Sequence, residues 1–191
     1  QAARDVAGTM KAGARNLAEN IAEYVIYMWQ MQDLLRAVNM DVESLDGFLR
    51  SFLPTEEKIQ EEKMWFAALA KSMKRSSAEE KGNVEEVQEV ISELNLLHTT
   101  LNTLLRDEEY IAANERAKEN LDAYRERTNG KALSEVEAYL TALYGLMMLR
   151  LRKQEISEET VQAMKTFSDV MALLALQYNK MKKGESVQHL N

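Results

Sequence analysis

The 191-residue sequence contains no cysteine. Zinc–thiolate sites, disulfide bonds, iron–sulfur clusters and cysteine nucleophiles are therefore excluded. Its two histidines, His98 and His189, are too few for a histidine metal cluster, and no Glu-x-x-His spacing suits a di-iron bundle. We therefore expect no bound metal and no cofactor.

Other sequence signals are also missing. The chain has one proline and seven glycines, and it contains neither a Gly-rich phosphate loop nor a nucleophile-elbow motif. Apolar runs such as YVIYMW, at residues 24–29, are far shorter than the roughly 20 residues of a membrane span. The formal net charge of -7 opposes binding to a phosphate backbone. We therefore expect no membrane span and no nucleic-acid partner.

Helical periodicity covers nearly the whole chain. Polar residues ahead of the periodic segments predict where helices begin. These expected capping residues are Asp41, Thr55, Asn83, Ser134 and Ser157. The pair Asn129-Gly130 and, later, Gly184 predict helix ends, because both suit left-handed backbone geometry.

This pattern predicts an all-α fold, a single-domain bundle of six or seven helices. We expect the Leu17 to Val38 helix at its centre, packed by the Ala142 to Leu151 and Val161 to Tyr178 helices. No linker divides the chain. The expected parts are an N-terminal extension with helical potential at residues 1–16, the bundle at 17–183 and a mobile tail at 184–191.

The central helix, NIAEYVIYMWQMQDLLRA, is apolar around most of its circumference but carries one polar stripe. On a helical wheel Glu19, Glu23 and Gln30 project within about 40° of one another, with Asp33 to one side. Two interpretations stay open. In the first, which we favour, the stripe faces a solvated groove or its side chains pair inside the bundle. In the second, it lines a ligand pocket.

Buried carboxylates need partners, which neighbouring helices would have to supply. The expected partners of the stripe are His98, Tyr144 and Arg150. We therefore place any specific ligand or partner contact at these residues and the stripe. A lone histidine beside an apolar helix face is more often a hydrogen-bonded core residue than a general base, and we interpret His98 in that way.

Acidic pairs suggest one enzymatic alternative. Glu85, Glu86 and Glu89 form EExxE, and Glu119 with Asp122 forms ExxD. The same order of acidic motifs occurs in all-helical nucleoside triphosphate pyrophosphohydrolases, where such acids would hold Mg²⁺ against phosphates. With 31 acidic residues in the chain, we favour a solvated helix face instead, and the gap between the motifs is longer than in that family.

Three segments resemble a bacterial family, typical of Bacteroidetes, that is described only as a domain of unknown function. They are NIAEYVIYMWQMQDLLRA, LNLLH and ALYGLMMLRLRKQEISEET, in the same order along residues 20–182. The resemblance implies an all-helical fold of cytosolic type and no established activity. Residues 1–16 and the loop at 76–82 depart from the pattern.

Taken together, these features predict a non-enzymatic helical interaction or regulatory module in the cytoplasm, with a protein partner or a homo-oligomer as its expected assembly. The alternative is a Mg-dependent nucleoside triphosphate pyrophosphohydrolase that uses the EExxE and ExxD acids. The sequence starts at Gln1, which leaves open a removed N-terminal targeting segment.

Overall fold

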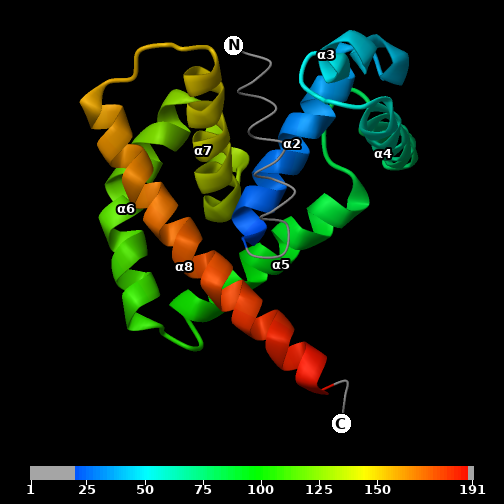
Figure 1. Ribbon diagram of the computed structural model, residues 1–191. Coiled ribbons are helices and arrows are strands. Elements are labelled where there is room, and N and C mark those ends of the chain that lie inside the picture. The colour runs from blue at the N-terminus through cyan, green and yellow to red at the C-terminus, as the bar shows by residue number, and fades with distance from the viewer. Residues whose placement is uncertain (1–19, 189–191) are drawn as a thin grey trace. The chain divides into compact units, whose positions relative to one another are not determined.

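A computed structural model describes residues 20–188, and these residues form helices without any strand. In chain order the elements are α2 (Ile21–Ala37), the 3₁₀ helix η1 (Val42–Leu45), α3 (Asp46–Arg50), α4 (Glu56–Arg75), α5 (Glu85–Asn102), α6 (Glu108–Arg127), the 3₁₀ helix η2 (Gly130–Ala132), α7 (Glu135–Leu151) and α8 (Glu158–Gln188) (Figure 1). The predicted all-α class with six or seven helices is confirmed for the described residues. None of the helices in this range is long and apolar enough to cross a membrane.

The described chain packs as two compact units. The first unit contains residues 27–89, and the second contains residues 20–26 and 90–188. Both boundaries fall inside helices, α2 and α5, rather than in a linker. The central position of α2 in one bundle, and its packing on α7 and α8, stay predictions.

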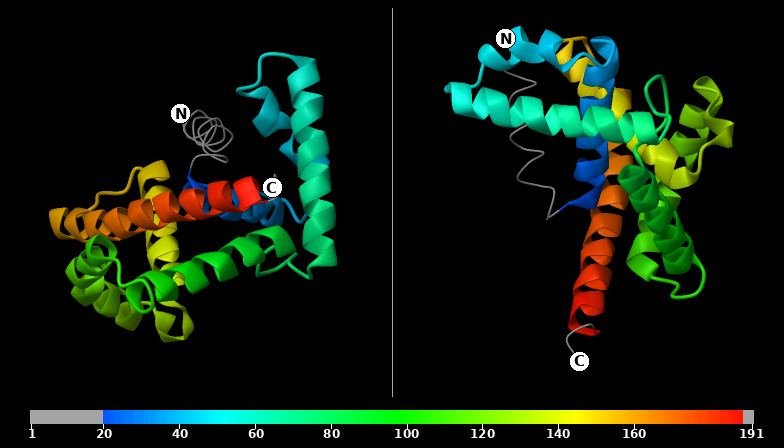
Figure 2. Two further views of the ribbon diagram at one scale, coloured as in Figure 1. Left: turned by 90° about the horizontal axis from the view of Figure 1, so that it is seen from below. Right: turned by 90° about the vertical axis from the view of Figure 1, so that its right-hand side faces the viewer.

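In the first unit, η1, α3 and α4 pack together (Figure 2). Lys63 on α4 has its ammonium 2.6 Å from the Asp46 carboxylate and 3.1 Å from that of Glu43. Arg50 binds the same Asp46 and also reaches Glu56 at the start of α4. These ion pairs tie the short helices to α4, and Lys63 is buried with its charge paired.

In the second unit, α6, α7 and α8 pack against one another (Figure 1). Tyr139 on α7 and Phe167 on α8 meet edge to face, with ring centroids 5.2 Å apart. Both rings are fully buried, which places the core of this unit between the two helices. Lys182 near the end of α8 pairs with Glu93 on α5 at 2.6 Å.

Several predicted helix ends are confirmed. The hydroxyls of Thr55, Ser134 and Ser157 each accept the backbone N–H three residues later. Asn129 has a left-handed backbone with φ of 54°, as its position before Gly130 predicts.

Other helix ends differ from prediction. Asp41 makes no capping bond to the backbone, because its carboxylate accepts from the Ser44 hydroxyl. Helix α4 ends with Ser77 in left-handed geometry, where Ala78 N–H binds Met73 O at 2.7 Å, although no glycine marks this end.

The prediction that a helix ends before Gly184 is wrong. Helix α8 continues through Gly184 to Gln188. Glycine lowers helix propensity by about 1 kcal/mol without forbidding the helical conformation, so the neighbouring residues can carry a helix through it. The expected mobility of the tail stays a prediction, and His189, Glu19 and the extension at 1–16 lie outside the described residues.

Helix α2 is buried nearly all round, as its composition predicts. Between Ala22 and Arg36 only Glu23 and Asp33 are exposed. Met31 has 0% of its surface exposed. The polar side chains at the two exposed positions can be hydrated by solvent. The buried polar side chains of this stretch require hydrogen bonds inside the protein.

Candidate functional site

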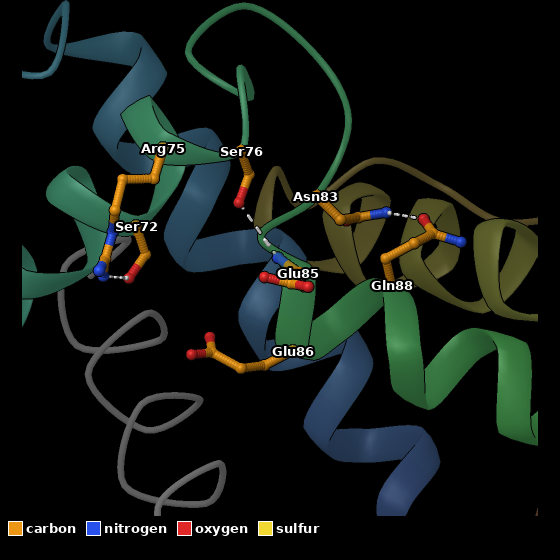
Figure 3. A pocket seen from close by; sticks show the side chains of 7 residues that line it. All are labelled: Ser72, Arg75, Ser76, Asn83, Glu85, Glu86 and Gln88. Atoms are coloured by element: carbon orange, nitrogen blue, oxygen red, sulfur yellow. Dashed lines mark hydrogen bonds between the residues drawn. The ribbon is translucent and has the colours of Figure 1, made fainter.

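The first unit contains a pocket of about 480 Å³ between the end of α4 and the start of α5. Its volume lies within the range of about 300–1,000 Å³ typical of small-molecule sites. All of its lining residues are polar or charged. They are Ser72, Arg75, Ser76, Asn83, Glu85, Glu86 and Gln88 (Figure 3). We refer to this site as the α4–α5 pocket.

The α4 wall of the pocket comes from the last helical turn and its cap. Ser72, Arg75 and Ser76 share one helix face because they are three and four residues apart. Arg75 donates a hydrogen bond from Nη2 to Ser72 Oγ at 3.2 Å. This bond holds one edge of the guanidinium and leaves the rest of its donors facing outward from Ser72.

The α5 wall comes from the first turn of that helix and from Asn83, which precedes it. Ser76 Oγ accepts the Glu85 N–H at 3.2 Å, which joins the two walls directly. Asn83 donates from its side-chain amide to Gln88 Oε1 at 3.4 Å. Both acids of the pocket, Glu85 and Glu86, lie in the first turn of α5. Their negative charges at this end of the helix interact favourably with the helix dipole.

Behind the pocket, a buried glutamine on α2 binds the start of α5. Gln32 has 0% of its surface exposed. Its Oε1 accepts the Val84 N–H at 2.9 Å, and its Nε2 donates to Asn83 Oδ1 at 3.2 Å. Both ends of this buried amide are thus hydrogen-bonded, which meets the usual requirement for a polar group in a protein interior.

Arg36, one helical turn further along α2, holds the loop between α4 and α5. Its guanidinium donates to Ala78 O at 3.0 Å and to Gly82 O at 2.6 Å. Gly82 has a φ of 90°, a conformation that side chains rarely adopt, so glycine is required at this turn. Two side chains of α2 therefore fix the loop that connects the pocket walls, and the pocket is preformed.

The charges of the pocket are not paired with one another. Arg75 lies on the α4 wall, and the Glu86 carboxylate points toward that side from α5 (Figure 3). In the described part of the chain, no ion pair joins Arg75 to Glu85 or Glu86. All three side chains are on exposed residues. Their donors and acceptors are accordingly available to a ligand.

The polar stripe predicted from the sequence does not line this pocket. Glu23 and Asp33 are exposed, and Asp33 pairs with Arg36 at 2.9 Å. Gln30 is buried, and its Oε1 has no hydrogen-bond partner among the described residues. The stripe as a site of ligand or partner contact stays a prediction.

His98 is a buried, hydrogen-bonded residue of the second unit. Its Nδ1 lies 2.6 Å from the Tyr110 hydroxyl, and its Nε2 lies 3.8 Å from the Glu135 carboxylate. The interaction with His98 lowers the pKa of Glu135, against the opposing effect of partial burial. Asn102 also donates to the His98 carbonyl at 2.9 Å.

Glu135, His98 and Tyr110 place a carboxylate, an imidazole and a hydroxyl in the order found in a nucleophilic triad. The burial of the hydroxyl excludes this role. Tyr110 is 1% exposed, and burial raises the pKa of its hydroxyl. A substrate could not reach it, so these groups form a structural network. Of the other expected partners, Tyr144 is half-buried and Arg150 is exposed, and their contact with Glu23 stays a prediction.

The acids of the alternative enzyme are all exposed. Glu85 and Glu86 line the α4–α5 pocket, whereas Glu89 does not. Glu119 and Asp122 belong to the second unit. Throughout residues 20–188, no three His, Asp or Glu side chains form a group that could hold a metal ion.

Sequence reasoning missed the residues that organise the pocket. Gln32 follows the buried Met31 on the largely apolar helix α2, and a glutamine on such a helix signals a buried amide that needs partners. For Arg36 the sequence indicated only a cation in the last turn of a helix, where it interacts favourably with the helix dipole. Ser76 could not have been found, because its partner is the start of another helix.

Comparison with known proteins identifies the family of this chain. The family model whose description is Domain of unknown function (DUF4924) matches residues 10–185. The match includes residues 10–16, which we had assigned to the extension, and the loop at 76–82. Neither the curated proteins nor the solved structures contain a match to this chain.

Proposed function

Because the chain belongs to the family described as Domain of unknown function (DUF4924), its function must be argued from its own residues, and we propose a non-enzymatic binding module with regulatory potential. Its α4–α5 pocket holds a small polar ligand. The observation that carries this proposal is a preformed pocket whose opposite charges face one cavity without pairing.

Preorganisation supports binding at this site. Gln32 and Arg36 hold the connecting loop, and Ser76 joins the two walls, before any ligand arrives. A site that is already ordered loses less conformational entropy when it binds. Arg75, Glu85 and Glu86 then offer charge-assisted hydrogen bonds, which are stronger than neutral ones.

The serine contacts support binding rather than nucleophilic chemistry. Ser72 Oγ accepts from Arg75, and Ser76 Oγ accepts from the Glu85 N–H. Activation of a serine requires a neighbouring general base that takes its proton, and neither contact supplies one.

The cellular setting is also part of the proposal. The resemblance of residues 20–37 and 142–160 to a Bacteroidetes-type family supports a bacterial, cytoplasmic protein. The formal net charge of -7 supports a partner other than nucleic acid. Leu104 and Leu105, which are 83% and 63% exposed in the turn after α5, support a protein partner or a homo-oligomer.

The binding proposal is tested by amide NMR titration of the full chain. The probes are L-lysine, cadaverine, succinate and acetamide. We expect saturable shifts at the amides of Ser76, Asn83 and Glu85 with at least one probe. Glu86→Ala should weaken the response, whereas Glu89→Ala, on the same helix but outside the pocket lining, should not.

Two outcomes would overturn the proposal. One is the absence of saturable shifts at the pocket with every probe. The other is steady release of pyrophosphate from nucleoside triphosphates with Mg²⁺, lost in Glu86→Gln, which would make the protein an enzyme of the alternative kind.

A further inference from the structure

The charges around the α4–α5 pocket do not balance. One guanidinium, from Arg75, lies on the α4 wall, and two carboxylates, from Glu85 and Glu86, lie on the α5 wall. A complementary ligand therefore carries one anionic group and two cationic groups. Its net charge is opposite in sign to that of the pocket.

The donor and acceptor inventory gives the chemistry of each group. A guanidinium is a planar fork of donors that matches a carboxylate in a bidentate arrangement. Arg75 is held at Nη2 by Ser72, so it is already oriented. Ionised carboxylates only accept hydrogen bonds, and an ammonium group offers three donors to Glu85 or Glu86.

We propose that the α4–α5 pocket binds a free basic α-amino acid. The ligand carboxylate lies on Arg75, and its two cationic groups lie on Glu85 and Glu86. This inference rests on the proposed function and specifies the ligand class of the same site.

Helix stabilisation also accounts for part of this arrangement. Arg75 stands in the last turn of α4 and the two glutamates in the first turn of α5, where each complements the dipole of its own helix. That effect explains the position of each charge along its helix. It does not require the three to line one cavity unpaired, and it predicts effects on stability without any effect on ligand choice.

The test compares three compounds that differ by one group. L-lysine carries the full set of charges, cadaverine lacks the carboxylate, and L-norleucine lacks the side-chain ammonium. Isothermal titration of the full chain should give the tightest binding for L-lysine. Each of the other two should bind at least about tenfold more weakly, as expected for loss of one charge-assisted hydrogen bond.

Variants assign each group to its partner. Arg75→Gln should reduce the affinity for L-lysine to about that for cadaverine and leave cadaverine binding no weaker. Glu86→Gln should weaken both. The matched controls are Lys74→Gln and Glu89→Gln, exposed neighbours outside the pocket lining that should bind L-lysine as the parent chain does. Circular dichroism checks that each variant is folded.

The outcomes separate the two proposals. Equal affinity for L-lysine and either analogue overturns the ligand class, while the binding module stands. Equal weakening by Arg75→Gln and Lys74→Gln overturns the class as well, because binding then lies outside the pocket. Failure of all three compounds overturns the class, and the binding module falls with it only when succinate and acetamide also leave the pocket amides unchanged.

Discussion

The side-chain oxygen of Gln32 accepts a hydrogen bond from the backbone N–H of Val84 at 2.9 Å, across 52 positions of the sequence. This bond satisfies a buried backbone donor just before α5, where no preceding helical turn supplies a partner. It also fixes the entry of α5, and therefore the position of the two acids in the α4–α5 pocket. A buried amide on one helix thus shapes a polar site built from two others.

Replacing Gln32 by leucine should destabilise the protein. The change leaves the Val84 N–H and the Asn83 amide without their buried partner, which costs about 1–3 kcal/mol for an unsatisfied polar group. Urea unfolding measures the difference. Gln60→Leu, at an exposed position of α4, is the control. Equal stability of the two variants would show that the Gln32 bonds contribute nothing measurable.

Met31→Ala should reduce the free energy of unfolding by about 2–5 kcal/mol, because its side chain is fully buried and its truncation leaves a cavity. Met64→Ala, with Met64 73% exposed, should change stability by no more than about 0.5 kcal/mol. Thermal and urea unfolding of the pair provide the measurement. A melting temperature unchanged in Met31→Ala would contradict the packing of α2.

Tyr110→Phe should reduce the free energy of unfolding by about 1–3 kcal/mol, because it leaves Nδ1 of the buried His98 without the hydroxyl that lies 2.6 Å away. Tyr24→Phe, at a half-buried position, serves as a comparison for loss of a less buried hydroxyl. If Tyr110→Phe instead abolished a ligand response at the α4–α5 pocket while the protein stayed folded, the purely structural role of this network would be wrong.

The free energy of unfolding should decrease at acidic pH because Asp46 becomes protonated. Hydrogen bonds from Arg50 and then Lys63 lower the pKa of Asp46 from 3.8 to about 2. The unfolded state therefore binds the proton first, so the contribution of Asp46 is complete above about pH 4 and is lost as the pH falls toward 2. Asp46→Asn should be less stable at neutral pH and lose less stability over this interval. Urea midpoints measured from pH 5 to about 2 give the comparison.

For this last prediction, Glu57→Gln at an exposed position of α4 is the control and should retain the decrease of the parent chain. A parallel pH dependence of Asp46→Asn and the parent chain would show that the carboxylate is not protonated preferentially on unfolding.

The all-helical fold could be predicted because its signals are local. Thr55, Ser134 and Ser157 cap helices whose first turns lie within three residues of each hydroxyl. The burial of α2 follows from the apolar residues around its circumference. The backbone conformation at two helix ends could not be predicted from residue type. Ser77 ends α4 in left-handed geometry although it is not a glycine, and Gly184 lies within helix α8.

The candidate site depended on contacts that local patterns do not contain. The sequence determined that α2 carries polar residues on a buried helix and that such residues require partners. Only the tertiary structure decided that Gln32 and Arg36 meet the α4–α5 loop, and that Arg75 faces the same cavity as Glu86. Helical periodicity depends on residues that are neighbours along the chain. A pocket depends on which distant segments pack together, and this packing is determined by the burial of apolar surface over the whole chain.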